Sequence, residues 1–186
     1  HCIGDTCDQV QVNGCNNLGE IRTRDSSGSA HCLTVGSLGR FPIIKHSLGL
    51  SEHNLVWQSV EDDNVDCPQF CYNRENKHIT LEYHDEDYAL EWDFSLLGID
   101  RGNQVEQHEK NAKIDTTDGD EFNYEASMGS ICGIVRNGDE CCLEMNDVSD
   151  NGYERDGEVF NGYEAKFDCN GDNTNTKRIY FYHQRN

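Results

Sequence analysis

The sequence is poor in basic residues, in proline and in long apolar runs. Its 186 residues include 15 Lys and Arg against 35 Asp and Glu, which gives a formal net charge of −20. A field of that sign repels nucleic-acid phosphates and anionic lipid headgroups. No apolar run approaches the roughly 18 residues that a membrane-spanning helix needs. We therefore predict no nucleic-acid partner and no insertion into membranes.

Familiar catalytic motifs are missing as well. The chain has no Gly-x-Ser-x-Gly nucleophile elbow, no phosphate-binding glycine loop and no His-Glu-x-x-His zinc helix. A glycosidase would pair two acids with aromatic sugar platforms, and the only tryptophans are Trp57 and Trp92. We predict that the protein is not an enzyme and uses no cofactor, and a secreted hydrolase ranks third among the candidate functions.

Apolar residues are scarce, but cysteines are abundant. The hydrophobic fraction is 35% and the mean hydropathy is −0.81, so the core is thin for this length. Ten cysteines without zinc-type Cys-x2-Cys pairs predict a disulfide framework, formed in an oxidising compartment. We predict disulfides at all ten cysteines, with the connectivity left open: Cys2, Cys7, Cys15, Cys32, Cys67, Cys71, Cys132, Cys141, Cys142 and Cys169.

The sequence starts at His1 and not at a methionine. This start predicts a processed terminus of a secreted, extracellular protein.

Cys141 and Cys142 are adjacent, and neighbouring side chains of a strand point to opposite faces of the sheet. These two cysteines are therefore expected to bond to different partners and to tie both faces of a sheet.

The cysteines fall into two groups along the chain. Six lie in the first 71 residues and four lie between Cys132 and Cys169. The stretch from Gly102 to Asp120 is polar, as expected of a linker or a long surface loop. We predict two separately stapled modules, residues 1–105 and residues 106–186.

The second module is predicted to be an antiparallel β-sandwich. Four of the five Asn-Gly dipeptides of the chain lie in it, and Asn-Gly is a strong hairpin signal because both residues tolerate positive φ. Between these turns, β-type residues predict five strands: Ser130–Arg136, Glu140–Met145, Tyr153–Phe160, Tyr163–Cys169 and Lys177–His183.

The first module is predicted to be α+β. Apolar and polar residues alternate in His78–Tyr83 and again in Tyr88–Phe94, which predicts a hairpin that turns at His84–Asp87. Short helices are expected over Cys67–Arg74, where Pro68 suits a first helical turn, and over Cys7–Val12.

Histidines supply the candidate metal ligands. His1 offers a terminal amine and an imidazole, as in a copper brace, and the alternative is an ordinary processed terminus. His78, Glu82 and His84 form a candidate zinc set. Residues two apart on a strand lie about 7 Å from one another, which favours a solvent-facing strand over a metal site.

Acidic, glycine-containing loops suggest a second candidate function. Such loops occur at Asp115–Glu121, Asn137–Glu140, Asp147–Gly152 and Asp168–Asn173, and oxygen-rich loops are what calcium prefers. Hairpin turns use the same residues for backbone reasons. The alternative function is thus an extracellular calcium-, metal- or glycan-binding module.

The cysteine layout resembles that of the dual-domain secreted effectors of Fusarium wilt fungi, the secreted-in-xylem type. The resemblance rests on the six cysteines from Cys2 to Cys71, followed by a separate C-terminal module. It implies a C-terminal β-sandwich and a virulence factor exported into the host apoplast or xylem, where immune receptors recognise some members. We predict a monomeric effector that binds a host extracellular or receptor protein.

Overall fold

The computed structural model describes most of the strand-forming parts of the chain. The described residues are 14–35, 52–61, 66–83, 85–93, 109–115, 119–134, 138–146, 153–155, 158–160, 163–169 and 178–183. They contain strands and turns but no helix. The strands are β1 (Asn17–Arg24), β2 (Ala30–Val35), β3 (Glu52–Ser59), β4 (Phe70–Asn73), β5 (His78–Tyr83), β6 (Glu86–Asp93), β7 (Glu109–Asp115), β8 (Asn123–Glu125), β9 (Ser130–Ile134), β10 (Glu140–Asn146), β11 (Tyr153–Arg155), β12 (Glu158–Phe160), β13 (Tyr163–Asp168) and β14 (Tyr180–Tyr182).

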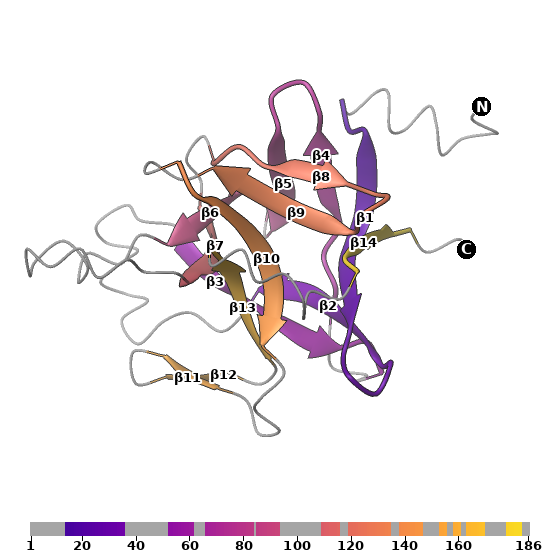
Figure 1. Ribbon diagram of the computed structural model, residues 1–186, viewed down its shortest axis with the longest axis vertical. Helices are drawn as coiled ribbons and strands as arrows, with labels where there is room; N and C mark the ends of the chain where they lie inside the picture. Colours follow the sequence, from indigo (N-terminus) through magenta and orange to yellow (C-terminus); the bar gives the residue numbers. More distant parts are fainter. Residues whose placement is uncertain are drawn as a thin grey trace, which may run out of the picture.

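Twelve strands form one antiparallel sheet, and β11 and β12 form a separate hairpin. The order along the large sheet is β14-β1-β4-β5-β6-β7-β3-β13-β10-β9-β8, with β2 paired to both β1 and β3. The sheet folds back on itself, so that β8 and β9 cross in front of β4 and β5 (Figure 1). The result is a sandwich-like arrangement of antiparallel strands.

The two ends of this sheet meet. The Ile179 amide, just before β14, donates a 2.8 Å hydrogen bond to the Gly129 carbonyl in the β8–β9 turn. The rings of Tyr124 on β8 and Phe181 on β14 make an edge-to-face contact, with centroids 4.8 Å apart. These contacts cover the terminal strands, which otherwise present unpaired backbone groups.

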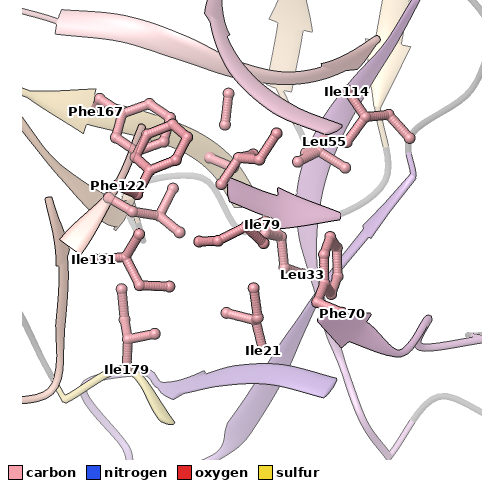
Figure 2. Packing of buried hydrophobic residues seen from close by; sticks show 14 of the residues in the cluster. Ile21, Leu33, Leu55, Phe70, Ile79, Ile114, Phe122, Ile131, Phe167 and Ile179 are labelled. Atoms are coloured by element: carbon pink, nitrogen blue, oxygen red, sulfur yellow. The ribbon is translucent and has the colours of Figure 1, made fainter. Parts of the chain in front are cut away.

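The core lies between the layers and draws on strands from the whole chain. Its fully buried side chains include Ile21 on β1, Trp57 on β3 and Ile114 on β7. Phe122 stacks on Phe167 of β13 with centroids 5.2 Å apart (Figure 2). The Trp57 indole donates a hydrogen bond of 3.1 Å to the Glu144 carbonyl, so the polar atom of this buried ring is satisfied.

Most of the strands expected in the C-terminal half are confirmed. The segment Ser130–Arg136 contains β9, Glu140–Met145 corresponds to β10, and Tyr163–Cys169 corresponds to β13. The segment Lys177–His183 contains β14. One strand was expected over Tyr153–Phe160, and the structure has two short strands there, β11 and β12.

The expected hairpin of the N-terminal half is also confirmed. Strands β5 and β6 pair with Tyr83 opposite Glu86, and Asp85 in the turn has a φ of 63°. Ile79 and Leu81 are buried, whereas Glu82 is exposed, as the alternation predicts.

The helix expected over Cys67–Arg74 is wrong. Phe70–Asn73 is strand β4, which pairs with β1 on one side and β5 on the other. Phe70 and Tyr72 are buried, and this two-residue period suits a strand between two neighbours. The helix expected over Cys7–Val12 lies outside the described residues, so the α+β assignment of the N-terminal half is not confirmed.

The linker expected over Gly102–Asp120 contains a central strand. β7 pairs with β6, β3 and β13, and its Ala112 and Ile114 are fully buried. Two apolar residues are enough here because the neighbouring strands complete the burial around them. Strands from either side of residue 105 therefore share one sheet, and β14 near the C-terminus pairs with β1.

Four disulfides cross-link the described residues. Cys15–Cys71 and Cys32–Cys67 lie within the first cysteine group, and Cys132–Cys142 and Cys141–Cys169 lie within the second. Cys2 and Cys7 lie outside the described residues. The adjacent Cys141 and Cys142 do bond to different partners, as expected, and they tie β10 to a neighbour on each side.

Candidate functional site

A polar groove of about 480 Å³ lies beside the Cys32–Cys67 disulfide. The C-terminal ends of β2, β3 and β5 and the segment before β4 form its walls. We call it the acidic groove, and its lining consists of Thr34, Val35, Gln58, Asp66, Pro68, Glu82 and Tyr83.

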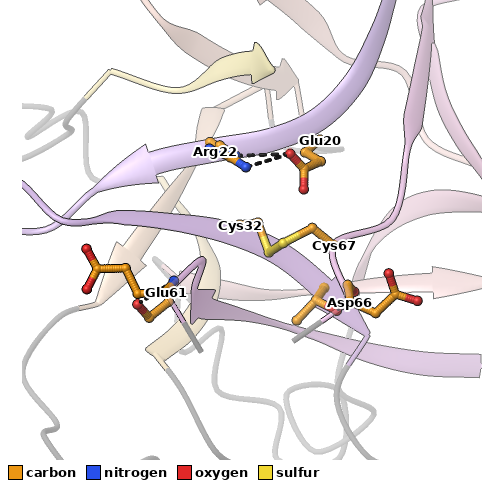
Figure 3. Close-up of a disulfide and its surroundings, with 8 residues drawn as sticks. Glu20, Arg22, Cys32, Glu61, Asp66 and Cys67 are labelled. Atoms are coloured by element: carbon orange, nitrogen blue, oxygen red, sulfur yellow. Dashed lines mark hydrogen bonds and ion pairs between the residues drawn. A yellow bond between two sulfur atoms is a disulfide. The ribbon is translucent and has the colours of Figure 1, made fainter. Parts of the chain in front are cut away.

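Strand register and one disulfide build this groove. Cys32 on β2 lies opposite Gln58 on β3, and alternation places Thr34 on the same face. The disulfide to Cys67 fixes the segment before β4 over that face (Figure 3). The Thr34 hydroxyl donates a 3.1 Å hydrogen bond to the Asp66 carbonyl, which gives this segment a second attachment.

Two carboxylates of the acidic groove have no partner among the described residues. Asp66 and Glu82 are both exposed, and no hydrogen bond or ion pair engages either side-chain carboxylate in the described structure. The Asp66 carboxylate points away from the disulfide in Figure 3. In contrast, the Glu91 carboxylate lies 3.9 Å from the Lys113 ammonium.

A nearby arginine does not neutralise the groove. The Arg22 guanidinium forms a 2.8 Å ion pair with Glu20, and it lies 3.6 Å from the centre of the Tyr182 ring. Figure 3 shows Glu20 and Arg22 on the opposite side of the disulfide from Asp66. Arg22 is therefore already paired with Glu20, and among the described residues that line the groove the two charged ones are both acids.

The lining offers hydrogen-bonding groups and apolar surface. It contains two carboxylates, an amide, a threonine hydroxyl, a tyrosine, a valine and a proline. Carboxylates accept hydrogen bonds and attract cations. Val35, Pro68 and the Tyr83 ring add apolar surface against which the stem of a longer ligand can pack.

A second cluster of titratable groups lies at the turn between β1 and β2. Asp25 Oδ1 accepts hydrogen bonds from the Ser27 amide, the Ser27 hydroxyl and the Ser29 amide, at 2.9, 2.6 and 2.9 Å. The Ser27 hydroxyl bond is the largest cause that lowers the pKa of Asp25, and partial burial opposes it.

Buried His31 completes this turn. Its Nδ1 lies 3.1 Å from the Ser29 carbonyl and 3.8 Å from Asp25 Oδ2, and since both are acceptors, Nδ1 carries the proton. The Ser27 hydroxyl bonds to the aspartate and not to the imidazole, so the three residues do not form a nucleophilic triad. The cluster stabilises a hairpin turn.

The metal sets expected from the sequence fall partly outside the described residues. His1 and His84 are outside them, so the copper and zinc sets stay predictions. His78 is half-buried on β5 and Glu82 faces the acidic groove. In the described part of the chain, the metal-type ligands that converge are Cys132, Glu140 and Cys142, and the two sulfurs are bonded to each other.

Of the four expected calcium loops, only parts are described. In the first, the Gly119 amide donates a 3.2 Å hydrogen bond to Glu91 Oε1, and the φ of Gly119 is 82°. In the second, Gly138, Asp139 and Glu140 are exposed. Calcium binding at these loops stays a prediction.

Searches against protein-family models, curated proteins and solved structures gave no match for this chain. Among the described residues, no helix is long and apolar enough to cross a bilayer. The groove, the disulfides and the charge are therefore the observations on which a function must rest.

Sequence reasoning did not find the acidic groove. Glu82 was a candidate zinc ligand and Asp66 was a neighbour of an expected helix, but nothing placed the two together. The signal that joins them is the Cys32–Cys67 pairing, and several pairings of six cysteines are compatible with the sequence.

Proposed function

We propose that this chain is a secreted effector of a plant-pathogenic fungus that acts by binding a host protein outside the cell, with the acidic groove as part of the contact surface. The observation that carries the proposal is a pair of carboxylates, Asp66 and Glu82, that have no partner among the described residues and line a groove beside a disulfide. Preorganised charged groups of this kind give a binding surface its specificity and its association rate.

Two further features support the proposal. The four disulfides among the described residues, in a chain with a thin core, are typical of a secreted, extracellular, cysteine-rich protein. The first cysteine group, from Cys2 to Cys71, resembles that of the Fusarium secreted-in-xylem effectors. A net charge of −20 also keeps the protein soluble and favours basic partners.

The test is a response in the host that depends on the groove. Purified protein would be infiltrated into leaves of several plant genotypes, and the gene would be deleted in the source organism. We expect a genotype-dependent response and reduced virulence on deletion. The variant Asp66→Asn/Glu82→Gln is expected to lose the response.

A matched variant controls for total charge. Glu75→Gln/Glu125→Gln removes the same two negative charges at exposed positions that do not line the groove. It is expected to behave like the unmodified protein. The absence of any genotype-dependent response together with unchanged virulence after deletion contradicts the proposal, and equal loss in both variants assigns the effect to overall charge.

A further inference from the structure

We infer that the acidic groove accommodates a single lysine or arginine side chain presented by the partner. This inference rests on the proposed function for the statement that the partner is a protein. Whether the groove binds a basic side chain does not depend on the host, and it is tested with small probes in the absence of host material.

Charge is the first argument. Asp66 precedes β4 and Glu82 ends the outward face of β5, so the two carboxylates come from different segments and face one volume. Neither side-chain carboxylate has a partner in the described structure, and the nearby Arg22 is committed to Glu20 and Tyr182. Both acids give the groove negative charge, which attracts a cation.

Shape is the second argument. A basic side chain has an apolar stem and a charged head, and stems of this kind pack along apolar surface while the head stays with polar groups. Val35, Pro68 and Tyr83 offer apolar surface next to the two acids. The volume of about 480 Å³ lies in the range of small ligand sites and admits a side chain rather than a folded element.

The walls are held in place before binding. The Cys32–Cys67 disulfide and the Thr34 hydrogen bond fix the segment that carries Asp66. The Tyr83 ring packs edge-on against Tyr88 of the next strand, with centroids 6.1 Å apart. A rigid groove loses little conformational entropy on binding, which favours affinity. The Tyr83 ring face is also a surface for a cation.

Other occupants match the groove less well. A calcium ion takes six to eight oxygens, and no group of three or more His, Cys, Asp or Glu ligands converges at this groove within the described residues. A neutral sugar leaves the two charges uncompensated. Both are included in the test as outcomes that overturn the inference.

The experiment is a titration of the whole protein followed by amide NMR shifts at low salt. The probes are N-acetyl-lysine N-methylamide and N-acetyl-arginine N-methylamide, with the norleucine analogue as the uncharged control. We expect saturable shifts at Gln58, Asp66 and Tyr83 with the basic probes, with Kd on the order of 1 mM, and weakening when salt is added.

Variants assign the binding to the two acids. Asp66→Asn and Glu82→Gln are each expected to raise Kd about two- to fivefold, as for exposed ion pairs, and the double variant more. Glu75→Gln/Glu125→Gln is expected to leave Kd unchanged at the same net charge. Both acids of the groove are exposed, so these substitutions leave the core intact.

Four results overturn the inference. They are equal shifts with the norleucine analogue, equal weakening in the control variant, no saturable shift with either basic probe, and tighter binding of calcium or of an oligosaccharide in the same groove. Failure of the leaf assay with intact probe binding refutes the host role and leaves the groove chemistry standing. A groove-dependent leaf response without probe binding refutes the inference about the basic side chain and leaves the proposed host role standing.

Discussion

The guanidinium of Arg22 lies 3.6 Å from the centre of the Tyr182 ring and so joins the first described strand to the last. Tyr182 stands opposite Glu20 in the register of β1 and β14, and Glu20 forms an ion pair with Arg22. Glu20 is only 8% exposed, and its Oε2 accepts hydrogen bonds from both Nε and a terminal nitrogen of Arg22. The Arg22–Tyr182 contact therefore helps to hold β14 against β1.

Replacement of Arg22 by methionine is expected to destabilise the fold. The variant loses the cation–π contact and leaves the Glu20 carboxylate unpaired in a buried setting, at a cost of about 2–4 kcal/mol. Urea unfolding measures the difference. The double variant Glu20→Gln/Arg22→Met is expected to recover part of the loss, and an additive loss in the double variant contradicts a direct pair.

The loss of stability on removal of a single disulfide is expected to increase with the length of the loop that the disulfide closes. Cys15–Cys71 spans a separation of 56 residues and Cys132–Cys142 spans 10. Loop-closure entropy gives about 4 kcal/mol for the first and about 3 kcal/mol for the second. Double-alanine variants at each pair, compared by denaturant unfolding, test this order, and a larger loss at Cys132–Cys142 is evidence against the entropic account.

Acid is expected to weaken the β1–β2 turn through Asp25. Its pKa is lowered from 3.8, chiefly by the hydrogen bond from the Ser27 hydroxyl. A carboxylate with a lowered pKa contributes stability above its unfolded pKa, and this contribution is lost as the pH falls through the folded pKa.

Thermal melts of the protein and of Asp25→Asn measure this effect. The difference in melting temperature between the two proteins is expected to be largest near neutral pH and to shrink as the pH falls below about 4. A difference that is constant from pH 7 to pH 2 excludes ionised Asp25 as the stabilising species.

Alkali is expected to act on Tyr124. Burial raises the pKa of this phenol above 10.0, and a backbone hydrogen bond from Phe181 opposes the shift. A raised phenol pKa means that the folded state favours the neutral form, so stability is retained below the unfolded pKa and declines as the pH rises from there toward the folded pKa.

The ultraviolet absorbance of ionised tyrosine measures this titration. One tyrosine is expected to ionise later than exposed ones, and Tyr124→Phe is expected to remove that late component. Persistence of the late component in the variant assigns it to another tyrosine.

The sequence predicted features that depend on neighbouring residues. The hairpin of β5 and β6 was correct because Ile79 and Leu81 alternate with polar residues, and period-two alternation is a local signal. The different partners of Cys141 and Cys142 followed from the same geometry. The Asn-Gly dipeptides likewise marked, along the sequence, the intervals between most strands of the C-terminal half.

Features that depend on distant residues were missed. β7 has only Ala112 and Ile114 as buried apolar residues, and its place in the sheet comes from β3, β6 and β13. Pro68 favoured a helix over Cys67–Arg74, but β4 forms there and pairs with β1 and β5. The backbone hydrogen bonds on both sides of β4 outweigh a weak local preference.

Composition and local alternation by themselves determined that this chain relies on disulfides and forms antiparallel strands, since both follow from residue types and from neighbours along the chain. Only the tertiary structure decided the strand order, the partner of each described cysteine and the meeting of Asp66 with Glu82 in one groove. The physical reason is that strand pairing and disulfide bonding join residues far apart in the chain, and local periodicity holds no information about which distant segments pair.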